Sequence, residues 1–321
     1  MGKKNIVWND YISQNERFAD FFNGVVFHGH QVVLPEDLTP LDSKLWRRQQ
    51  EKNSYNEYIR DTVKLWKHGD KKYILSLEPE ESPHFALPVK YMNYESVQYD
   101  RQYKERMKDH RKNRDLCPDE YLTGFSASDR LLPVVTIGIY LGEKKWSGCS
   151  HLSEMTGIKE GSGTINRYLA PFCNEFHANL INIYDLKTCD VFQTDLREVF
   201  GFLRFREDKK QLRIYVEGNE AFGHLQEDAF DVLSAYGAVD LELCKEEYRT
   251  KEGIDMCLAL QQWKEEARTE GKAEGKAEGI AAMNKLIYFM VKEGRAEELL
   301  RSSKNSDYQR KLMQECGIDM Y

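Results

Sequence analysis

The feature that most constrains the fold is the run LLPVVTIGIYL at residues 131–141, which contains no charged side chain. Its β-branched, almost wholly apolar residues predict a central strand that is buried on both faces of its sheet. Strands followed by helices around one such strand are typical of an α/β domain with a mixed sheet. Further strands are expected at 180–185 and 212–216, and further helices at 15–23, 195–204 and 226–237.

Upstream of this run, the pattern predicts a β-hairpin followed by a long helix. Residues 60–68 alternate as a strand, His68-Gly69-Asp70 form a turn and residues 72–78 form the second strand. An amphipathic helix is expected from about 86 to 112, and a more polar helix across 43–58, before the hairpin.

Composition limits the class of protein. Of the 321 residues, 41% are hydrophobic and 31% are charged, which is enough for a sizeable core beneath a charged surface. The net charge of −7 repels polyanions at long range, so any contact with nucleic acid requires a local basic patch. The seven cysteines contain no Cys-x-x-Cys pair, which favours reduced thiols over a disulfide framework or a zinc ribbon.

The chain shows no sign of a membrane segment. Its longest apolar run is much shorter than the roughly 20 residues that span a bilayer, and residues 1–10 lack the apolar stretch of a signal peptide. We therefore expect a soluble cytoplasmic protein.

Composition changes beyond about residue 245. Residues 253–301 are strong helix formers without proline, and they include the tandem repeat TEGKAEGKAEGIA. Its glycines recur every four residues and form one slowly drifting stripe on a helix, where each costs about 1 kcal/mol relative to alanine. We expect one domain over 1–245 and a helical tail over 246–321. The tail is either a helix that packs its backbone against a partner or a weak helix that acts as a tether.

Three acidic residues around the predicted hairpin are candidate metal ligands. Asp61 begins the first strand, while Glu78 ends the second and is followed two residues later by Glu80. Side chains two apart on a strand point to the same face, so Glu78 and Glu80 are expected to lie together, near Asp61. Carboxylates that converge in this way bind Mg²⁺ or Mn²⁺. The alternative is that acidic residues at a strand exit are simply hydrated.

Four segments, in order, resemble the recombination-promoting nucleases, a transposase-like family of the PD-(D/E)XK nuclease superfamily. They are FADFFNGVVFHGHQVVLPEDLTPLD (18–42), RDTVKLWKHGDKKYILSLEPEESPHFALPVKYMNYESVQYDRQ (60–102), LTGFSASDRLLPVVTIGIYLGEKKWSG (122–148) and LREVFGFLRF (196–205). The resemblance implies a restriction-endonuclease-like mixed sheet core flanked by helices, and an endonuclease that cuts DNA with Mg²⁺ or Mn²⁺. It also implies a link to recombination or mobile elements.

The resemblance also assigns roles to particular residues. Asp61 stands at the family's metal-binding aspartate and Glu78 at the acidic position of its E-x-Q or E-x-K motif. The third position departs from the family, because Glu80, preceded by Pro79, replaces the usual glutamine or lysine. A lysine there offsets charge on the phosphate. A glutamate cannot do so, although it can act as a general base or as a further metal ligand. Lys90 supplies a positive charge where relatives often have arginine.

The stretch RQYKERMKDHRKNR at 101–114 carries seven basic residues against two acidic ones. It is either a hydrated helix face or a phosphate-binding surface whose affinity for DNA falls with salt. The candidate DNA-binding residues are Arg101, Lys104, Lys108, Arg111 and Lys112. Asp20 on the first helix is either an accessory acid of the site or an ordinary residue of the helix surface.

The replacement at Glu80 leaves a second function open, in which the protein binds DNA or a protein partner without catalysis. The resemblance also makes a homodimer a hypothesis, because restriction-like folds often use two active sites to cut both strands. A third alternative is that the tail makes the chain a subunit of a larger assembly.

Overall fold

The computed structural model describes residues 3–41, 44–49, 54–59, 62–159, 164–237, 248–250, 253–303 and 305–318. Internal contacts divide the chain into two units, Met1–Met256 and Cys257–Tyr321. The boundary expected between residues 245 and 246 lies outside the described residues.

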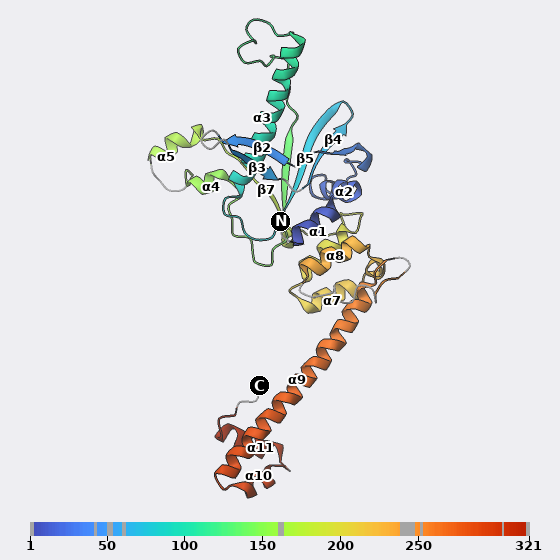
Figure 1. Cartoon of the computed structure of the whole chain (residues 1–321), viewed down its shortest axis with the longest axis vertical. Helices are drawn as coiled ribbons and strands as arrows, with labels where there is room; N and C mark the ends of the chain where they lie inside the picture. The colour runs from blue at the N-terminus through green and yellow to red at the C-terminus, as the bar shows by residue number, and fades with distance from the viewer. Residues whose placement is uncertain are drawn as a thin grey trace. The chain divides into compact units, whose positions relative to one another are not determined.

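A five-stranded mixed sheet forms the centre of the first unit, in the order β1-β4-β5-β6-β7. The strands are β1 (Leu38–Pro40), β4 (Thr62–His68), β5 (Lys71–Glu80), β6 (Val134–Tyr140) and β7 (Asn179–Asn182). β1, β4 and β5 pair antiparallel, whereas β5, β6 and β7 pair parallel. The α/β fold and the mixed sheet predicted from the sequence are therefore confirmed. The central strand is β5, however, and the run 131–141 that was predicted to be central supplies β6 beside it (Figure 1).

The hairpin of β4 and β5 turns at Gly69, whose φ of 58° lies in the left-handed region that glycine adopts without strain. Pro79 sits inside β5 although it has no N–H to donate. The backbone oxygen of Glu80 accepts from Leu141 N, and Ile74 N donates to Pro133 O, so the even-numbered residues of β5 bond to the β6 side. The nitrogen of Pro79 therefore faces away from β6, and the parallel ladder loses no hydrogen bond.

The helix α3 (Leu87–Asn113) connects the parallel strands β5 and β6 and covers one face of the sheet. Val63, Ile74 and Val134 form an apolar cluster on this face, against which Tyr99 of α3 packs. The two-stranded sheet of β2 (Lys44–Gln49) and β3 (Ser54–Ile59) also contacts α3 (Figure 1). The predicted long helix over 86–112 is confirmed.

The opposite face of the sheet contacts an aromatic core. It involves α1 (Lys3–Ile12), α2 (Asn15–Val25), α6 (Leu196–Phe205) and α8 (Glu227–Tyr236). Lys64 of β4 points into this side, where its Nζ lies 2.5 Å from both Ser13 O and Asn15 Oδ1. Buried Arg17 of α2 binds both Asp195 and Asp228, which ties α2 to the segments that begin α6 and α8.

The strand expected at 180–185 is confirmed only in its first half, since β7 ends at Asn182 and residues 183–185 form a 3₁₀ turn. Two further predicted elements are wrong. The polar helix expected over 43–58 is the antiparallel pair β2 and β3, in which Lys44 faces Ile59. Its charged residues are good helix formers, but helix propensity is a weak guide, and strand pairing beside α3 overrides it here. The strand expected at 212–216 lies in α7 (Lys209–Glu217), where buried Leu212 and Val216 stand four residues apart on one helix face. The side chain of Asp208 caps this helix at Lys210 N and Gln211 N.

Shorter elements complete the first unit. They are α4 (Leu152–Thr156), α5 (Thr164–Leu169) and four 3₁₀ turns at Pro35–Asp37, Ala170–Phe172, Ile183–Asp185 and Glu220–His224.

The second unit contains three helices among its described residues. α9 (Met256–Lys292) carries the repeat, and α10 (Ala296–Ser302) and α11 (Ser306–Glu315) follow it. Leu286 and Met290 of α9 pack against Leu312 and Met313 of α11. A Cβ built on Gly275 or Gly279 has nothing within 4 Å, so neither glycine packs closely within this chain.

Candidate functional site

The two glutamates of β5 lie together beneath α3. Glu78 and Glu80 share a face of the strand because they are two residues apart. In the parallel register they stand beside Gly138 and Tyr140 of β6. Glu78 is fully buried and Glu80 is 6% exposed, so neither is the hydrated surface carboxylate that the alternative interpretation of the sequence describes.

Glu80 is held by two donors from the first turn of α3. Its Oε1 accepts from Lys90 Nζ at 2.7 Å and from the Tyr91 hydroxyl at 3.0 Å. Burial, together with the negative charges of Glu80 and Glu78, raises the pKa of Tyr91 well above its ordinary value. The phenol therefore keeps its proton at neutral pH and remains a donor. Lys90 is the more accessible partner, with 22% of its side chain exposed.

Glu78 lies deeper in the same face. Its Oε1 accepts at 3.1 Å from the hydroxyl of Ser76, which lies two residues earlier on the same face of β5. Beside it, Gly138 has no side chain, and this allows the Tyr91 hydroxyl to pass close to β6. Within this arrangement only the Glu80–Lys90 end of the pair reaches solvent.

The third predicted ligand, Asp61, lies outside the described residues. The residue that follows it, Thr62, pairs with Leu77, the residue that precedes Glu78. Among the residues that the structure describes, no group of three or more His, Cys, Asp or Glu side chains is arranged to hold a metal ion.

The donor chemistry of the glutamate pair fits a hard divalent cation. Carboxylate oxygens are the ligands that Mg²⁺ and Mn²⁺ prefer, and Glu78 and Glu80 present two carboxylates on one face. Because Glu80 Oε1 already accepts from Lys90 and Tyr91, Oε2 is the oxygen of Glu80 that remains to meet a cation.

The predicted DNA-binding residues all lie on α3, and all are exposed. Arg101, Lys104, Lys108 and Arg111 follow one another at intervals of three and four, which places them on one stripe of the helix, with Lys112 beside it. Arg101 pairs with Glu105 and Lys104 with Asp100, so the two basic residues nearest the glutamates are partly neutralised. At 1.5 Å per residue, the stripe runs from about 16 to about 33 Å from Lys90 along the helix axis.

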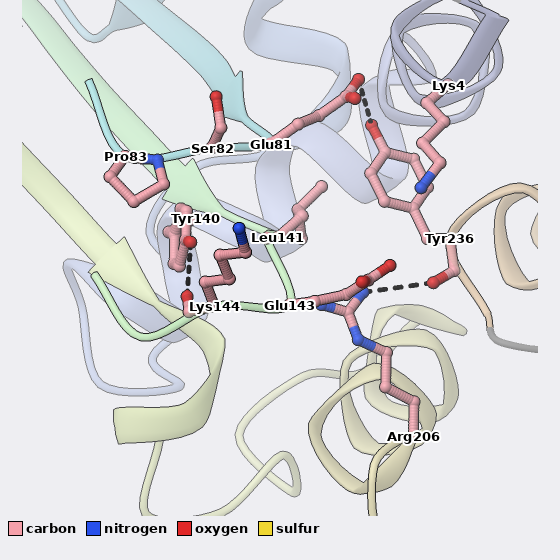
Figure 2. A pocket seen from close by; sticks show the side chains of 11 residues that line it. Lys4, Glu81, Ser82, Pro83, Tyr140, Leu141, Glu143, Lys144, Arg206 and Tyr236 are labelled. Atoms are coloured by element: carbon pink, nitrogen blue, oxygen red, sulfur yellow. Dashed lines mark hydrogen bonds between the residues drawn. The ribbon is translucent and has the colours of Figure 1, made fainter. Parts of the chain in front are cut away.

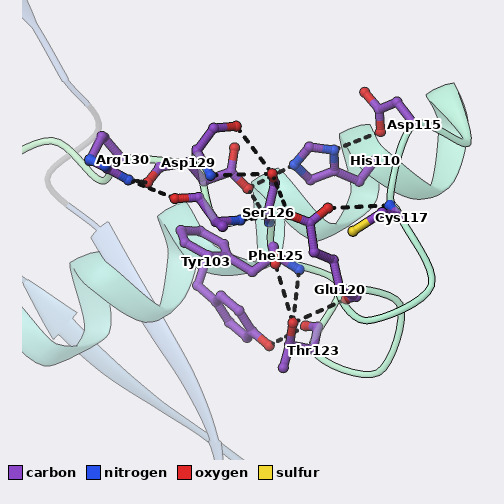
Figure 3. Close-up of polar contacts among 12 residues, drawn as sticks. Tyr103, His110, Asp115, Cys117, Glu120, Thr123, Phe125, Ser126, Asp129 and Arg130 are labelled. Carbon is purple, nitrogen blue, oxygen red and sulfur yellow. Dashed lines mark hydrogen bonds and ion pairs between the residues drawn. The ribbon is translucent and has the colours of Figure 1, made fainter.

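A polar network fastens the far end of α3 to the segment that leads back to the sheet (Figure 3). His110 bonds Asp115 at 2.7 Å and Asp129 at 2.8 Å, and both bonds raise the pKa of its imidazole. Glu120 accepts from Ala127 N, Ser126 and Cys117 N, and these bonds lower the pKa of its carboxyl to about 2. The network holds in place the end of α3 that carries Arg111 and Lys112.

Nearer the sheet, α3 is fastened to the same returning segment. Gln102 exchanges two hydrogen bonds with the backbone of Leu132, at 2.7 and 3.2 Å. The Tyr99 hydroxyl accepts from Val134 N at 3.1 Å. The C-terminal half of α3, from Tyr99 to His110, is therefore attached to the returning segment at several points along its length.

Asp20 is neither an accessory acid at the glutamate pair nor a surface residue. It is 3% exposed. Its carboxylate accepts from the backbone nitrogens of Gln193 and Thr194 and from the Thr194 hydroxyl. These bonds anchor the segment that enters α6.

Sequence reasoning did not identify Tyr91 or Gly138. The available signal for Gly138 was a glycine inside an otherwise apolar, β-branched strand, which marks a close approach by another group. Tyr91 carried no comparable signal, because its role depends on the packing of α3 over β6.

Comparison of the chain with protein-family models, with curated proteins and with solved structures gives no match. Of the helices in the described part of the chain, none is both long enough and apolar enough to cross a membrane.

Proposed function

We propose that this protein is a metal-dependent DNA endonuclease with a restriction-endonuclease-like core of the PD-(D/E)XK type. The observation that carries the proposal is the buried pair Glu78 and Glu80 on the central strand, with the Lys90 ammonium 2.7 Å from Glu80. The order of elements supports it, since an antiparallel hairpin is followed by a helical crossover to a parallel strand. The sequence resemblance implies acidic residues at these places on the hairpin.

Each residue has a role in this proposal. Asp61 and Glu78 hold the cation, which when bound lowers the pKa of water and stabilises negative charge on the phosphate. Glu80 orients the attacking water and accepts its proton. Tyr91 donates to Glu80 and holds its carboxylate in place. Lys90 counters charge that develops on the phosphate.

The Glu80–Lys90 pair supports activity despite the departure from the family motif. A lysine at position 80 would bring its ammonium from β5. Here Glu80 stands at that position, and an ammonium approaches the same point from the first turn of α3. The ammonium at the end of the strand therefore comes from α3 instead of β5, and the Glu80 carboxylate stands beside it.

The basic stripe of α3 supports DNA as the substrate. It ends about 33 Å from Lys90, which is close to the 34–36 Å of one turn of duplex. A duplex bound with a phosphate at Lys90 can therefore meet Lys108, Arg111 and Lys112 within its next turn.

A second candidate function is DNA or protein binding without hydrolysis. Two observations favour it: Glu78 is fully buried, and Glu80 is already neutralised by Lys90. In such a protein the glutamates and Lys90 would serve to hold α3 on the sheet.

Cleavage of supercoiled plasmid in Mg²⁺ or Mn²⁺ distinguishes the two functions. We expect wild type to nick the plasmid and Asp61→Ala to lose cleavage while remaining folded. Asp70→Ala is the matched control, because it removes an exposed aspartate from the opposite end of the same hairpin. Glu80→Gln reports whether the glutamate assists or hinders cleavage.

The contrary result would be no cleavage by any variant, with DNA binding that needs no metal. Calorimetry of Mg²⁺ binding to wild type and to Asp61→Ala separates the two functions further. A nuclease should lose Mg²⁺ binding in Asp61→Ala, whereas a module that only binds DNA or protein should have no metal site that this substitution affects.

We further propose a cytoplasmic homodimer that cuts both strands of DNA. Cys117, Cys149, Cys173, Cys189 and Cys316 form no disulfide, which fits a reducing compartment. Sedimentation of the full chain and of a chain ending at Met256 tests the assembly, because an unchanged mass after truncation would show that the tail takes no part in it.

A further inference from the structure

A pocket of about 280 Å³ opens where β5 and β6 end (Figure 2). Its wall is formed by the segments that follow the two strands, by α1 and by residues at the ends of α6 and α8. Three cations line it, namely Lys4, Lys144 and Arg206, against the carboxylates of Glu81 and Glu143. The lining is therefore net positive in a protein whose overall charge is −7.

Arg206 is the unusual member of this lining. Only 2% of its side chain is exposed. Its Nη1 donates to Tyr236 O at 3.2 Å, whereas Nε and Nη2 are buried with no hydrogen-bond partner in the described part of the chain. The nearby carboxylate of Glu207 is 62% exposed and lies 3.7 Å from Nε, beyond hydrogen-bond distance. Burying such donors without an acceptor is costly.

Arg17 shows how this chain satisfies a buried guanidinium. Its side chain is 3% exposed, and its Nε and Nη2 each donate at 2.8 Å to one oxygen of Asp195. These two nitrogens form one edge of the guanidinium, which matches the paired oxygens of a carboxylate or a phosphate. On Arg206 the same edge has no hydrogen-bond acceptor among the described residues, and the ion-paired Glu207 carboxylate, 3.7 Å from Nε, does not fill that place.

The surroundings of Arg206 also suit an anion with several oxygens. The Tyr184 ring lies 5.9 Å from Arg206 Cζ, and its hydroxyl is buried without a hydrogen-bond partner among the described residues. The Tyr140 hydroxyl donates to Lys144 O at 2.5 Å, which fixes the backbone of Lys144 at the pocket. The side chain of Lys144 is exposed and can reach a ligand that enters from solvent.

The pocket is continuous with the end of the sheet that carries the glutamate pair. Glu81 of its lining follows Glu80 directly. Tyr140 pairs with Glu80, and Leu141 N donates to Glu80 O at 2.9 Å. A group held by Arg206 therefore belongs to the same ligand-binding end of β5 and β6.

We propose that this pocket binds a phosphate group through the Nε and Nη2 edge of Arg206, with Lys144 as a second cation. Resting on the nuclease function proposed above, the phosphate is a backbone phosphate of the substrate DNA next to the one that is cut. Arg206 and Lys144 position the strand and take no part in the chemical step.

Calorimetric titration of the full chain with inorganic phosphate, in constant chloride, tests the pocket without any need for cleavage. We expect wild type to bind phosphate and Arg206→Gln to weaken binding at least tenfold. Arg204→Gln is the control, because it changes a nearby arginine, in the last turn of α6, that does not line the pocket. Lys144→Ala changes an exposed side chain, and it keeps the test valid if Arg206→Gln fails to fold.

Binding of duplex DNA in EDTA identifies the source of the phosphate. Weaker duplex binding by Arg206→Gln and Lys144→Ala supports a backbone phosphate, whether or not wild type cleaves DNA. Loss of phosphate binding with unchanged duplex binding would overturn the DNA assignment in favour of free phosphate. No phosphate binding by wild type, or equal binding by Arg206→Gln, would overturn the pocket itself.

Discussion

Tyr91 and Gly138 fit against each other across the contact between α3 and β6. A Cβ built on Gly138 would lie 2.1 Å from the Tyr91 hydroxyl oxygen, closer than any ordinary non-bonded contact. The same hydroxyl lies 3.0 Å from Glu80 Oε1. The absence of a side chain at position 138 therefore allows α3 to supply a donor to the glutamate pair.

Replacing this glycine should displace Tyr91. We expect Gly138→Ala to lower the free energy of unfolding by about 1–3 kcal/mol, the usual cost of overpacking. Urea denaturation measures it, with Gly223→Ala as the control, because a Cβ there has nothing within 4 Å. Equal stability of the two variants would show that α3 can shift without cost.

Lys64 should make stability depend on pH. Burial lowers its pKa from 10.5 to about 8. Above pH 8 the unfolded chain therefore binds more protons than the folded one, and stability rises with pH. We expect the stability of wild type relative to Lys64→Met to increase by about 1 kcal/mol between pH 8 and pH 9. Below pH 8 the penalty of the buried charge is fully present.

Urea titrations at pH 7, 8 and 9 measure this difference. Lys67→Met is the control, since Lys67 is an exposed lysine of the same strand. A constant difference between wild type and Lys64→Met across this range would contradict a lowered pKa.

His110 should stabilise the segment 115–129 only while it is protonated. Its hydrogen bonds to Asp115 and Asp129 raise the pKa above 6.5. The stabilisation is therefore complete below pH 6.5 and is lost as pH rises through the higher folded-state pKa. Hydrogen exchange, corrected for the intrinsic rate, should show less protection of this segment at pH 8.5 than at pH 6.

The His110→Gln variant should show low protection at both pH values, whereas His30→Gln, which changes an exposed histidine, should behave as wild type. Equal protection of wild type at the two pH values would mean that the imidazole charge does not hold the segment.

The basic end of α3 should set the salt dependence of DNA binding. If Lys108, Arg111 and Lys112 each neutralise one phosphate, replacing all three by glutamine should reduce the slope of log K against log salt by about 3. Fluorescence anisotropy in EDTA measures the slope. The control replaces three exposed lysines of the β4–β5 hairpin, Lys67, Lys71 and Lys72. An equal reduction of the slope in this control would show that the basic end of α3 has no special role in DNA binding.

The local pattern predicted the hairpin and α3 because each has its own signal. Gly69 supplies a turn that other residues resist, and the alternation on either side of it defines two strands. The pair β2 and β3 could not be predicted in this way. Its residues are polar and charged, and they carry no clear strand pattern. Their strand structure depends on the pairing of β2 with β3 and on contact with α3, and neither can be read from the local sequence.

Only part of the candidate site could be predicted from the sequence. The spacing of Glu78 and Glu80 places them on one face of any strand. Their burial, and the approach of Lys90 and Tyr91, depend on how α3 crosses the sheet. The phosphate pocket could not be predicted from the sequence at all, because Arg206, Lys144 and Lys4 come from three separate segments that meet only in the folded protein.

The parallel pairing of β5 with β6 has a consequence for the order of folding. Ile74 pairs with Val134, 60 residues further along the chain, whereas the β4–β5 hairpin closes through a short turn. Closing the longer loop costs more chain entropy, so the hairpin is expected to form first and the parallel pair later. During synthesis Glu78 and Glu80 therefore stay hydrated until β6 has emerged, so the enclosed site matures later than the hairpin that carries it.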